Sequence, residues 1–241
     1  MKQRMKHMNL LQRSIVLVLG AWIMAGCAQA KPKYGSERSL AWPGIRRQIW
    51  AVAPAIDLSG HKQVDPLLQA DLLYQQLQEV QGITAIPVNR VAEVYASLRI
   101  DKVQSEEQAA LVCELLGCDG LLVASVTAYD PYNPPKFGAS VQLFARPGTF
   151  ARPAAVDVRE LVRSATPETN DSVPRQNGFF QVVGMYDAAN GTVRQAVLDY
   201  AAGRHDPAGP WGSKEYFVSM DRYCGFVYHS LIEELIGAVA R

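Results

Sequence analysis

The chain has 241 residues, of which 49% are hydrophobic and 20% charged, and its formal net charge is +1. The apolar fraction is ample for a packed core, and the length fits one larger domain or a domain with insertions. A nucleic-acid-binding domain carries a large basic excess, which this composition lacks, so we do not expect nucleic acid as a main partner.

Residues 1–26 predict an export signal. The first thirteen residues carry four basic side chains and no acidic one, and Ser14 to Ala25 form an apolar run that ends in small residues. The run is too short for a stable transmembrane helix, which needs about 20 apolar residues. Removal of residues 1–26 takes away those four basic charges and lowers the formal net charge from +1 to −3.

The stretch 24–27, Met-Ala-Gly-Cys, resembles a bacterial lipobox, with Met where Leu is commoner. We therefore expect Cys27 to be lipidated and to hold the mature chain on a membrane, since several acyl chains together give stable anchoring. Ala28 follows in place of the Asp that usually retains a lipoprotein in the inner membrane. This favours the outer membrane, with the protein facing the periplasm. Plain secretion after Ala30, where residues 28–30 read Ala-Gln-Ala, and a retained anchor remain alternatives.

Residues 27–47 predict a lipidated tether and residues 48–241 a single periplasmic domain. The hydrophobic patterns predict strands and helices in the following order. Strands are expected at 48–56, 83–88, 120–130, 139–145 and 179–188, and helices at 64–80, 89–98, 105–116, 192–202 and 216–239. An alternation of this kind is typical of an α/β fold, here an α+β variant in which helices pack on a mixed sheet.

Local signals support several of these boundaries. Gly82 is expected to stop the first helix, Asn89 to cap the second, and Ser105 with Gln108 to form a capping box for the third. The Pro- and aromatic-rich stretch 127–137 predicts a wide hairpin turn, with a recognition surface as the alternative.

Residues 146–178 break the pattern. This stretch of 33 residues contains four prolines and mixed charges. Loops of this length are uncommon inside compact domains, so the stretch predicts a flexible insertion.

Besides Cys27 the chain has Cys113, Cys118 and Cys224. Four residues separate Cys113 from Cys118, a spacing that matches neither a Cys-x-x-Cys redox pair nor a common zinc knuckle. Two interpretations stay open. The thiols act as small buried hydrophobes, or two of the three form a disulfide in an oxidising compartment, and the sequence does not say which two.

No phosphate-binding glycine loop, dinucleotide-binding glycine turn or nucleophile elbow is present in the sequence. The histidines of the mature chain, His61, His205 and His229, fall in three different segments. His61 near Asp57 and the pair His205-Asp206 are interpreted as polar loop residues, not as sites. We expect no catalytic residue, no metal site and no cofactor.

Four segments, 49–60, 65–78, 83–95 and 110–130, carry a family resemblance. They resemble the α/β domain shared by curli-secretion lipoproteins, the TolB amino-terminal domain and the lipoprotein activators of penicillin-binding proteins. Asn89-Arg90 and the stretch 117–120, Gly-Cys-Asp-Gly, stand in the matching places, whereas Ala55 replaces the Phe of the first turn.

The resemblance implies non-enzymatic work in envelope assembly, secretion or cell-wall synthase regulation. The predicted function is thus that of a lipid-anchored envelope protein that contacts another envelope protein. The first alternative is a homo-oligomeric, curli-type outer-membrane secretion channel, whose barrel strands of about 9–11 alternating residues would be sought in the insertion. The second is an envelope enzyme in which His61, Asp57 and a distant carboxylate or thiol converge.

Overall fold

The computed structural model describes residues 40–146, 149, 178–206 and 208–240, all within one compact unit, Tyr34–Arg241. The expected signal, Cys27 and most of the expected insertion lie outside the described residues. The strands are β1 Gln48–Val52, β2 Ile56–Asp57, β3 Ile83–Ile86, β4 Gly120–Asp130, β5 Lys136–Ala145 and β6 Phe179–Asp187. The helices are α2 Pro66–Gln78, α3 Val88–Leu98, α4 Glu106–Leu116, α6 Gly191–Ala201, η1 Gly212–Lys214, α7 Glu215–Val218 and α8 Met220–Val239.

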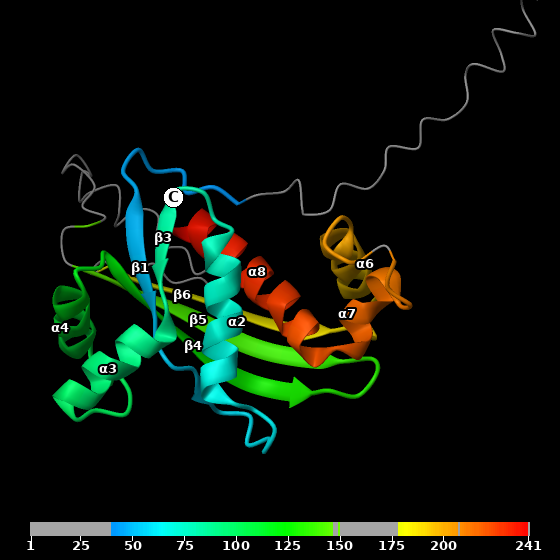
Figure 1. Cartoon of the computed structure of the whole chain (residues 1–241), viewed down its shortest axis with the longest axis horizontal. Helices are drawn as coiled ribbons and strands as arrows, with labels where there is room; N and C mark the ends of the chain where they lie inside the picture. Colours follow the sequence, from blue (N-terminus) through cyan, green and yellow to red (C-terminus); the bar gives the residue numbers. More distant parts are fainter. Residues whose placement is uncertain (1–39, 147–148, 150–177, 207, 241) are drawn as a thin grey trace, which may run out of the picture. The chain divides into compact units, whose positions relative to one another are not determined.

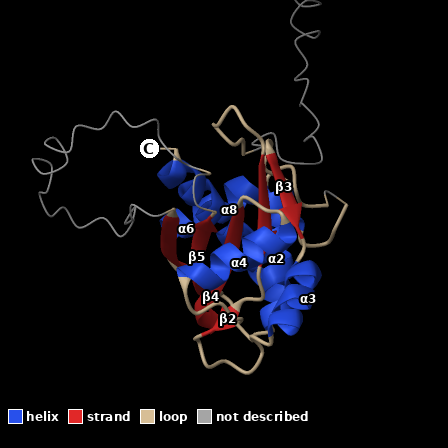
Figure 2. Ribbon diagram, turned by 90° about the vertical axis from the view of Figure 1, so that its left-hand side faces the viewer, coloured by secondary structure: helices blue, strands red, loops and turns tan. Residues whose placement is uncertain are grey.

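The strands form one mixed sheet in the order β3-β1-β4-β5-β6, and β2 also pairs with β4 (Figure 1). β1 runs parallel to β3 and β4, while β4, β5 and β6 form an antiparallel meander. The helices pack against this sheet (Figure 2). The expected fold class, an α/β mixed sheet with packed helices, is confirmed.

Successive side chains of β1 and β4 point to opposite faces of the sheet. Trp50 and Leu122 join the core beneath α2 and α8, whereas Ala51 and Leu121 join a second core beneath α3 and α4. The sheet is therefore covered on both faces, and this agrees with the nearly continuous apolar runs of its central strands.

At the start of α2 and of α4, a side-chain oxygen accepts a hydrogen bond from an amide in the first helical turn. The Asp65 carboxylate accepts a hydrogen bond from the Leu67 amide at 2.9 Å, and Pro66 occupies the first position of α2. Ser105 caps α4 by accepting from the amide of Gln108, whose side-chain oxygen in turn accepts from the amide of Gln104. The predicted capping by Ser105 is confirmed, although the return bond reaches one residue earlier than in the usual box.

Three local expectations are wrong. α2 ends at Gln78 with Glu79 as its cap, so the helix stops before it reaches Gly82. Pro87 and not Asn89 precedes the first residue of α3, because the extended backbone of Pro87 sets the helix start and its carbonyl accepts from the Arg90 amide. The run predicted as one strand at 48–56 is divided between β1 and β2, because Pro54 has no N–H for the ladder.

The end of the expected tether lies on the domain. Ala41 forms an isolated bridge with Gln81, and the Trp42 amide donates to the Gln81 carbonyl at 2.8 Å. The Trp42 ring meets the buried Trp50 edge to face at a centroid distance of 5.5 Å. Among the helices of the described ranges, none is both long and apolar enough to cross a membrane.

Candidate functional site

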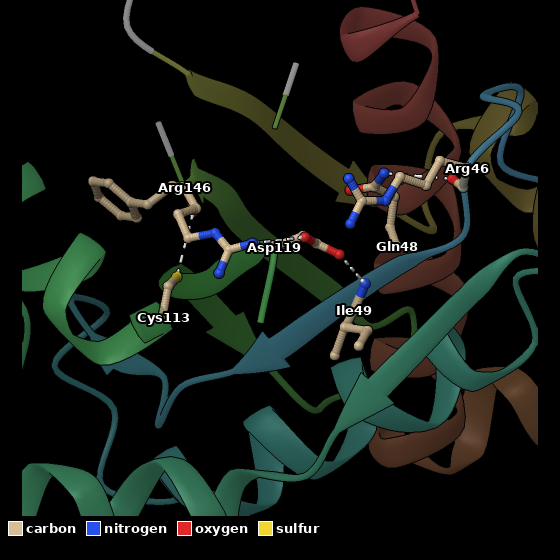
Figure 3. Close-up of polar contacts among 7 residues, drawn as sticks. Arg46, Gln48, Ile49, Cys113, Asp119 and Arg146 are labelled. Atoms are coloured by element: carbon tan, nitrogen blue, oxygen red, sulfur yellow. Dashed lines mark hydrogen bonds and ion pairs between the residues drawn. The ribbon is translucent and has the colours of Figure 1, made fainter. Parts of the chain in front are cut away.

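Asp119 is a buried carboxylate at the start of β4, between β1 and β5. Its Oδ2 accepts the Ile49 amide hydrogen at 2.9 Å, and its Oδ1 lies 3.4 Å from Nη2 of Arg146 (Figure 3). The Asp119 backbone also donates to the Ile49 carbonyl at 2.7 Å and accepts from the Arg146 amide at 2.8 Å. We call these three residues the Asp119 clamp.

The Asp119 clamp holds the start of β1, the start of β4 and the end of β5 together. Each carboxylate oxygen of Asp119 accepts a hydrogen bond from a neighbouring segment, so the side chain links β1 to the end of β5. Arg146 is the first residue of the expected insertion, and next to it the Ala145 amide donates to the Gly178 carbonyl at 2.7 Å. The clamp therefore lies beside the two ends of the expected insertion that the structure describes, Arg146 and Gly178.

Gln48 lies beside the clamp at the start of β1 and is almost fully buried. Its side-chain amide donates to the Arg46 carbonyl at 3.4 Å, and its Oε1 has no hydrogen-bond partner among the described residues (Figure 3). A buried amide oxygen without a partner is costly. The Gln48 side chain can therefore accept one further hydrogen bond.

Asp57 ends β2 and His61 lies in the loop that follows, and these are the two residues that the enzyme alternative requires. The Asp57 carboxylate accepts from the Ser59 hydroxyl at 2.6 Å and from the Ser59 amide, and these bonds lower the pKa of Asp57. The His61 ring lies 5.2 Å from the Tyr129 ring. Burial raises the pKa of Tyr129 to about 12, so this phenol is neutral at ordinary pH.

The structure brings no activated thiol to this loop within the residues that it describes. Cys224 lies on the buried face of α8, and burial raises the pKa of its thiol. A nucleophilic cysteine requires the opposite shift. Cys113 and Cys118 belong to the core on the other face of the sheet.

A buried polar network between α2, α6 and α8 was missed in the sequence. The Tyr200 hydroxyl donates to Oε1 of Gln76 at 2.7 Å. The guanidinium of Arg204 lies 4.2 Å from the centre of the Tyr200 ring and pairs with Glu79 at 2.6 Å. His229 lies against the same ring at 4.9 Å, and burial, with the nearby Arg204 charge, lowers the pKa of His229 to about 4.

A sequence signal for this network existed. Gln69 and Gln76 lie seven residues apart in the expected helix 64–80, so they share one helical face with apolar neighbours. Both are buried in the structure, and the Tyr228 hydroxyl donates to Gln69 at 3.0 Å. Polar residues that repeat within an apolar face indicate buried partners.

His205 and Asp206 form a polar turn, as predicted. Nδ1 of His205 lies 2.8 Å from the Ala201 carbonyl at the end of α6, and Asp206 accepts from the Ala208 amide. In the described part of the chain, no three His, Cys, Asp or Glu side chains lie close enough together to hold a metal ion.

No protein-family model and no curated protein matches this chain. Solved structures do match. The LpoB C-terminal domain from Salmonella enterica is 11% identical with a TM-score of 0.38, and the match covers 60% of this chain and 87% of that domain. Lipoprotein GNA1162 from Neisseria meningitidis is 15% identical with a TM-score of 0.32, and the match covers 49% of this chain and 92% of that protein. The PelC dodecamer from Paraburkholderia phytofirmans is 10% identical with a TM-score of 0.34, and the match covers 85% of this chain and 93% of that chain. At these identities and TM-scores, the matches show a weak likeness of fold to these proteins.

Proposed function

We propose that the protein is an outer-membrane lipoprotein that works by protein contacts in envelope assembly, secretion or cell-wall synthase regulation, without an enzymatic activity of its own. The observation that carries this proposal is the Met-Ala-Gly-Cys stretch at 24–27, directly behind a basic start and a short apolar run. Residues 1–26 are the cleaved signal in this proposal, residues 27–47 link lipid to domain, and residues 48–241 form the periplasmic domain.

Two variants distinguish lipidation from plain secretion. Cys27→Ser removes the acyl acceptor, and Ala30→Leu places a bulky residue where the competing cleavage site needs a small one. We expect the wild type and Ala30→Leu to be membrane-bound, with the intact mass of a chain that starts at Cys27 and carries three acyl groups. We expect Cys27→Ser to lose the acyl mass and to leave the membrane fraction. An unmodified wild-type chain that starts at Lys31, and is lost in Ala30→Leu, contradicts the proposal.

The partner contact that we propose is the outer edge of β6. This strand ends the sheet order, and Val183 and Met185 on it are 48% and 55% exposed. Natural edge strands are often protected by Lys or Pro, and neither residue occurs in the stretch 181–187 of this strand. Such an edge can bind an extended segment of another protein through main-chain hydrogen bonds, while alternate side chains give specificity.

Site-specific photo-crosslinking in cells tests this contact. A photoreactive residue at Val183 or Met185 should yield a crosslinked product with another envelope protein. Leu115 on α4 is the matched control, because it is equally exposed at 54% but lies on a different element. Equal products from all three positions contradict the β6 contact. A product between two copies of this chain favours the homo-oligomeric channel alternative instead.

A further inference from the structure

The three cysteines of the described residues lie on opposite faces of the sheet. Cys113 and Cys118 belong to the core beneath α3 and α4, and Cys224 belongs to the core beneath α2 and α8. All three are fully buried free thiols in the structure. A disulfide from Cys224 to either of the others would have to cross the sheet, so the fold leaves one intramolecular pair.

The end of α4 brings Cys113 and Cys118 together. Gly117 adopts φ +66°, which reverses the chain after the helix. The Cys118 amide then donates to the Cys113 carbonyl at 2.9 Å, the long-range bond of a Schellman motif. In that motif, the side chain beyond the turn often contacts the last turn of the helix, and Cys113 and Cys118 do belong to the same buried cluster.

The neighbouring thiols also affect each other's protonation. The proximity of Cys118, together with burial, raises the pKa of Cys113, whereas the proximity of Cys113 lowers the pKa of Cys118. In the structure the Cys113 thiol itself donates to the Phe144 carbonyl at 4.0 Å. Cys118 is therefore the better nucleophile of the two, since thiolate and not thiol attacks a disulfide.

We propose that Cys113 and Cys118 form a disulfide when the protein meets an oxidising compartment, and that Cys224 stays a thiol. The oxidant is a second disulfide, carried by a protein or by glutathione. Cys118 as thiolate attacks one sulfur of that disulfide and releases the first thiol. Cys113 then loses its proton and attacks the Cys118 sulfur, which releases the second thiol. Two protein thiols are oxidised and one external disulfide is reduced.

Because both sulfurs are buried, disulfide exchange requires a state in which the oxidant can reach them. An oxidant reaches them only before α4 docks on the sheet or while α4 is detached. Once formed, the bond ties the end of α4 to the residue that precedes Asp119, and the folded domain shields it from reductants. The inference that the protein meets an oxidising compartment rests on the proposed function. The choice of Cys113 and Cys118 as the pair rests on the fold alone.

Refolding of the full chain in a glutathione buffer tests the pair. The Cys27→Ala background removes the fourth thiol, and the chain is unfolded, refolded with oxidised and reduced glutathione, denatured again and alkylated. We expect two of the three remaining thiols to be lost to alkylation, with only Cys224 labelled and a chain lighter by two hydrogen atoms. Labelling of all three cysteines, a stable glutathione adduct or a pair that includes Cys224 overturns the inference.

Matched variants and a cellular measurement separate the two proposals. Cys224→Ala should still lose two thiols, whereas Cys113→Ala should leave both remaining thiols reactive. Alkylation of wild-type protein directly in cells then reports the compartment. A pair that forms in the glutathione buffer but stays reduced in cells contradicts export while the pairing stands. Failure in the buffer overturns the pairing and leaves the export proposal intact.

Discussion

The two faces of the sheet are covered by helices but are held in different ways. The core beneath α2 and α8 contains large side chains such as Trp50, Phe137 and Tyr228, together with the Tyr200 network. The core beneath α3 and α4 is lined mainly by alanine, valine, leucine and cysteine, with Tyr95 as its one buried aromatic residue among those described.

This difference indicates how stability is distributed. Hydrophobic stabilisation grows with the apolar area removed from water, at about 25 cal/mol per Å². The α2/α8 face therefore contributes more of the folding free energy, and the α3/α4 face depends more on its helix caps and on the Asp119 clamp. We expect α3 and α4 to open before the rest of the domain, because regions with fewer buried apolar contacts open at lower free energy.

The largest expected effect comes from two neighbouring leucines of β4. Leu122 and Leu121 are both fully buried but point to opposite faces. Each change to Ala removes about 2–5 kcal/mol from the free energy of unfolding, depending on how far the cavity can collapse. We expect Leu122→Ala to lie near the top of that range and Leu121→Ala near the bottom, as measured by urea unfolding. Equal losses, or a larger loss for Leu121→Ala, contradict the comparison.

His229 should make the α2/α8 face sensitive to acid. Its pKa is lowered to about 4 by burial, whereas a histidine in the unfolded chain titrates near 6.5. The unfolded state thus binds more protons between these pH values, so stability is full above about pH 6.5 and falls as the pH drops toward 4, by up to about 3 kcal/mol.

Urea unfolding at a series of pH values checks this prediction. His229→Phe keeps a ring against Tyr200 and should remove the extra acid sensitivity, so its profile is flatter than that of the wild type over this range. His61→Gln is the control, because it changes a loop histidine and should follow the wild-type profile. Parallel profiles for the wild type and His229→Phe contradict the assignment.

The smallest effect is expected at the Asp119 clamp. Asp119→Ala leaves the Ile49 amide without its acceptor and should cost about 2 kcal/mol of unfolding free energy, within the range for a lost buried partner. Arg146→Ala should cost less, about 0.2–1 kcal/mol, because the Arg146 side chain is 42% exposed and its ion pair is screened by water.

Thiol reactivity gives the clamp variants a second readout. If the clamp stabilises the α3/α4 face, Asp119→Ala should speed the alkylation of reduced Cys113 in the native protein more than that of Cys224. Equal acceleration at both cysteines would indicate general unfolding and would contradict a local role for Asp119.

The sequence predicted the elements much better than their contacts. The pattern of Val64 to Val80 gave α2 within two residues at each end, and Ser105 identified the start of α4, because both signals depend on neighbours along the helix. Asn89 misled because a proline two residues earlier already provides the extended residue that begins α3. Asn89 and Pro87 are both residues that can begin a helix, and their spacing in the sequence does not show which of them does so.

The candidate site was beyond such reasoning. Asp119 was noticed as part of a motif, but its partner Ile49 lies 70 residues away in sequence. Tyr200 and Gln76 are separated by 124 residues. Which strands become neighbours depends on the packing of the whole domain, and the side-chain periods of strands and helices contain no information about it.

The hydrogen bond between Ala145 and Gly178 joins the end of β5 to the start of β6, and this makes the connection between the two strands a suitable place for inserted residues. This bond and the Asp119 clamp fix the chain at Gly178 and at Arg146, so we expect the length of the chain between them to affect folding mainly through the entropy of closing it. Loop closure becomes harder only slowly with length, by about 0.6 kcal/mol for each doubling. We therefore expect that residues 150–177 can be shortened, extended or exchanged for a module with adjacent termini at little cost in folding free energy, so that new binding properties can arise there while the rest of the fold is kept.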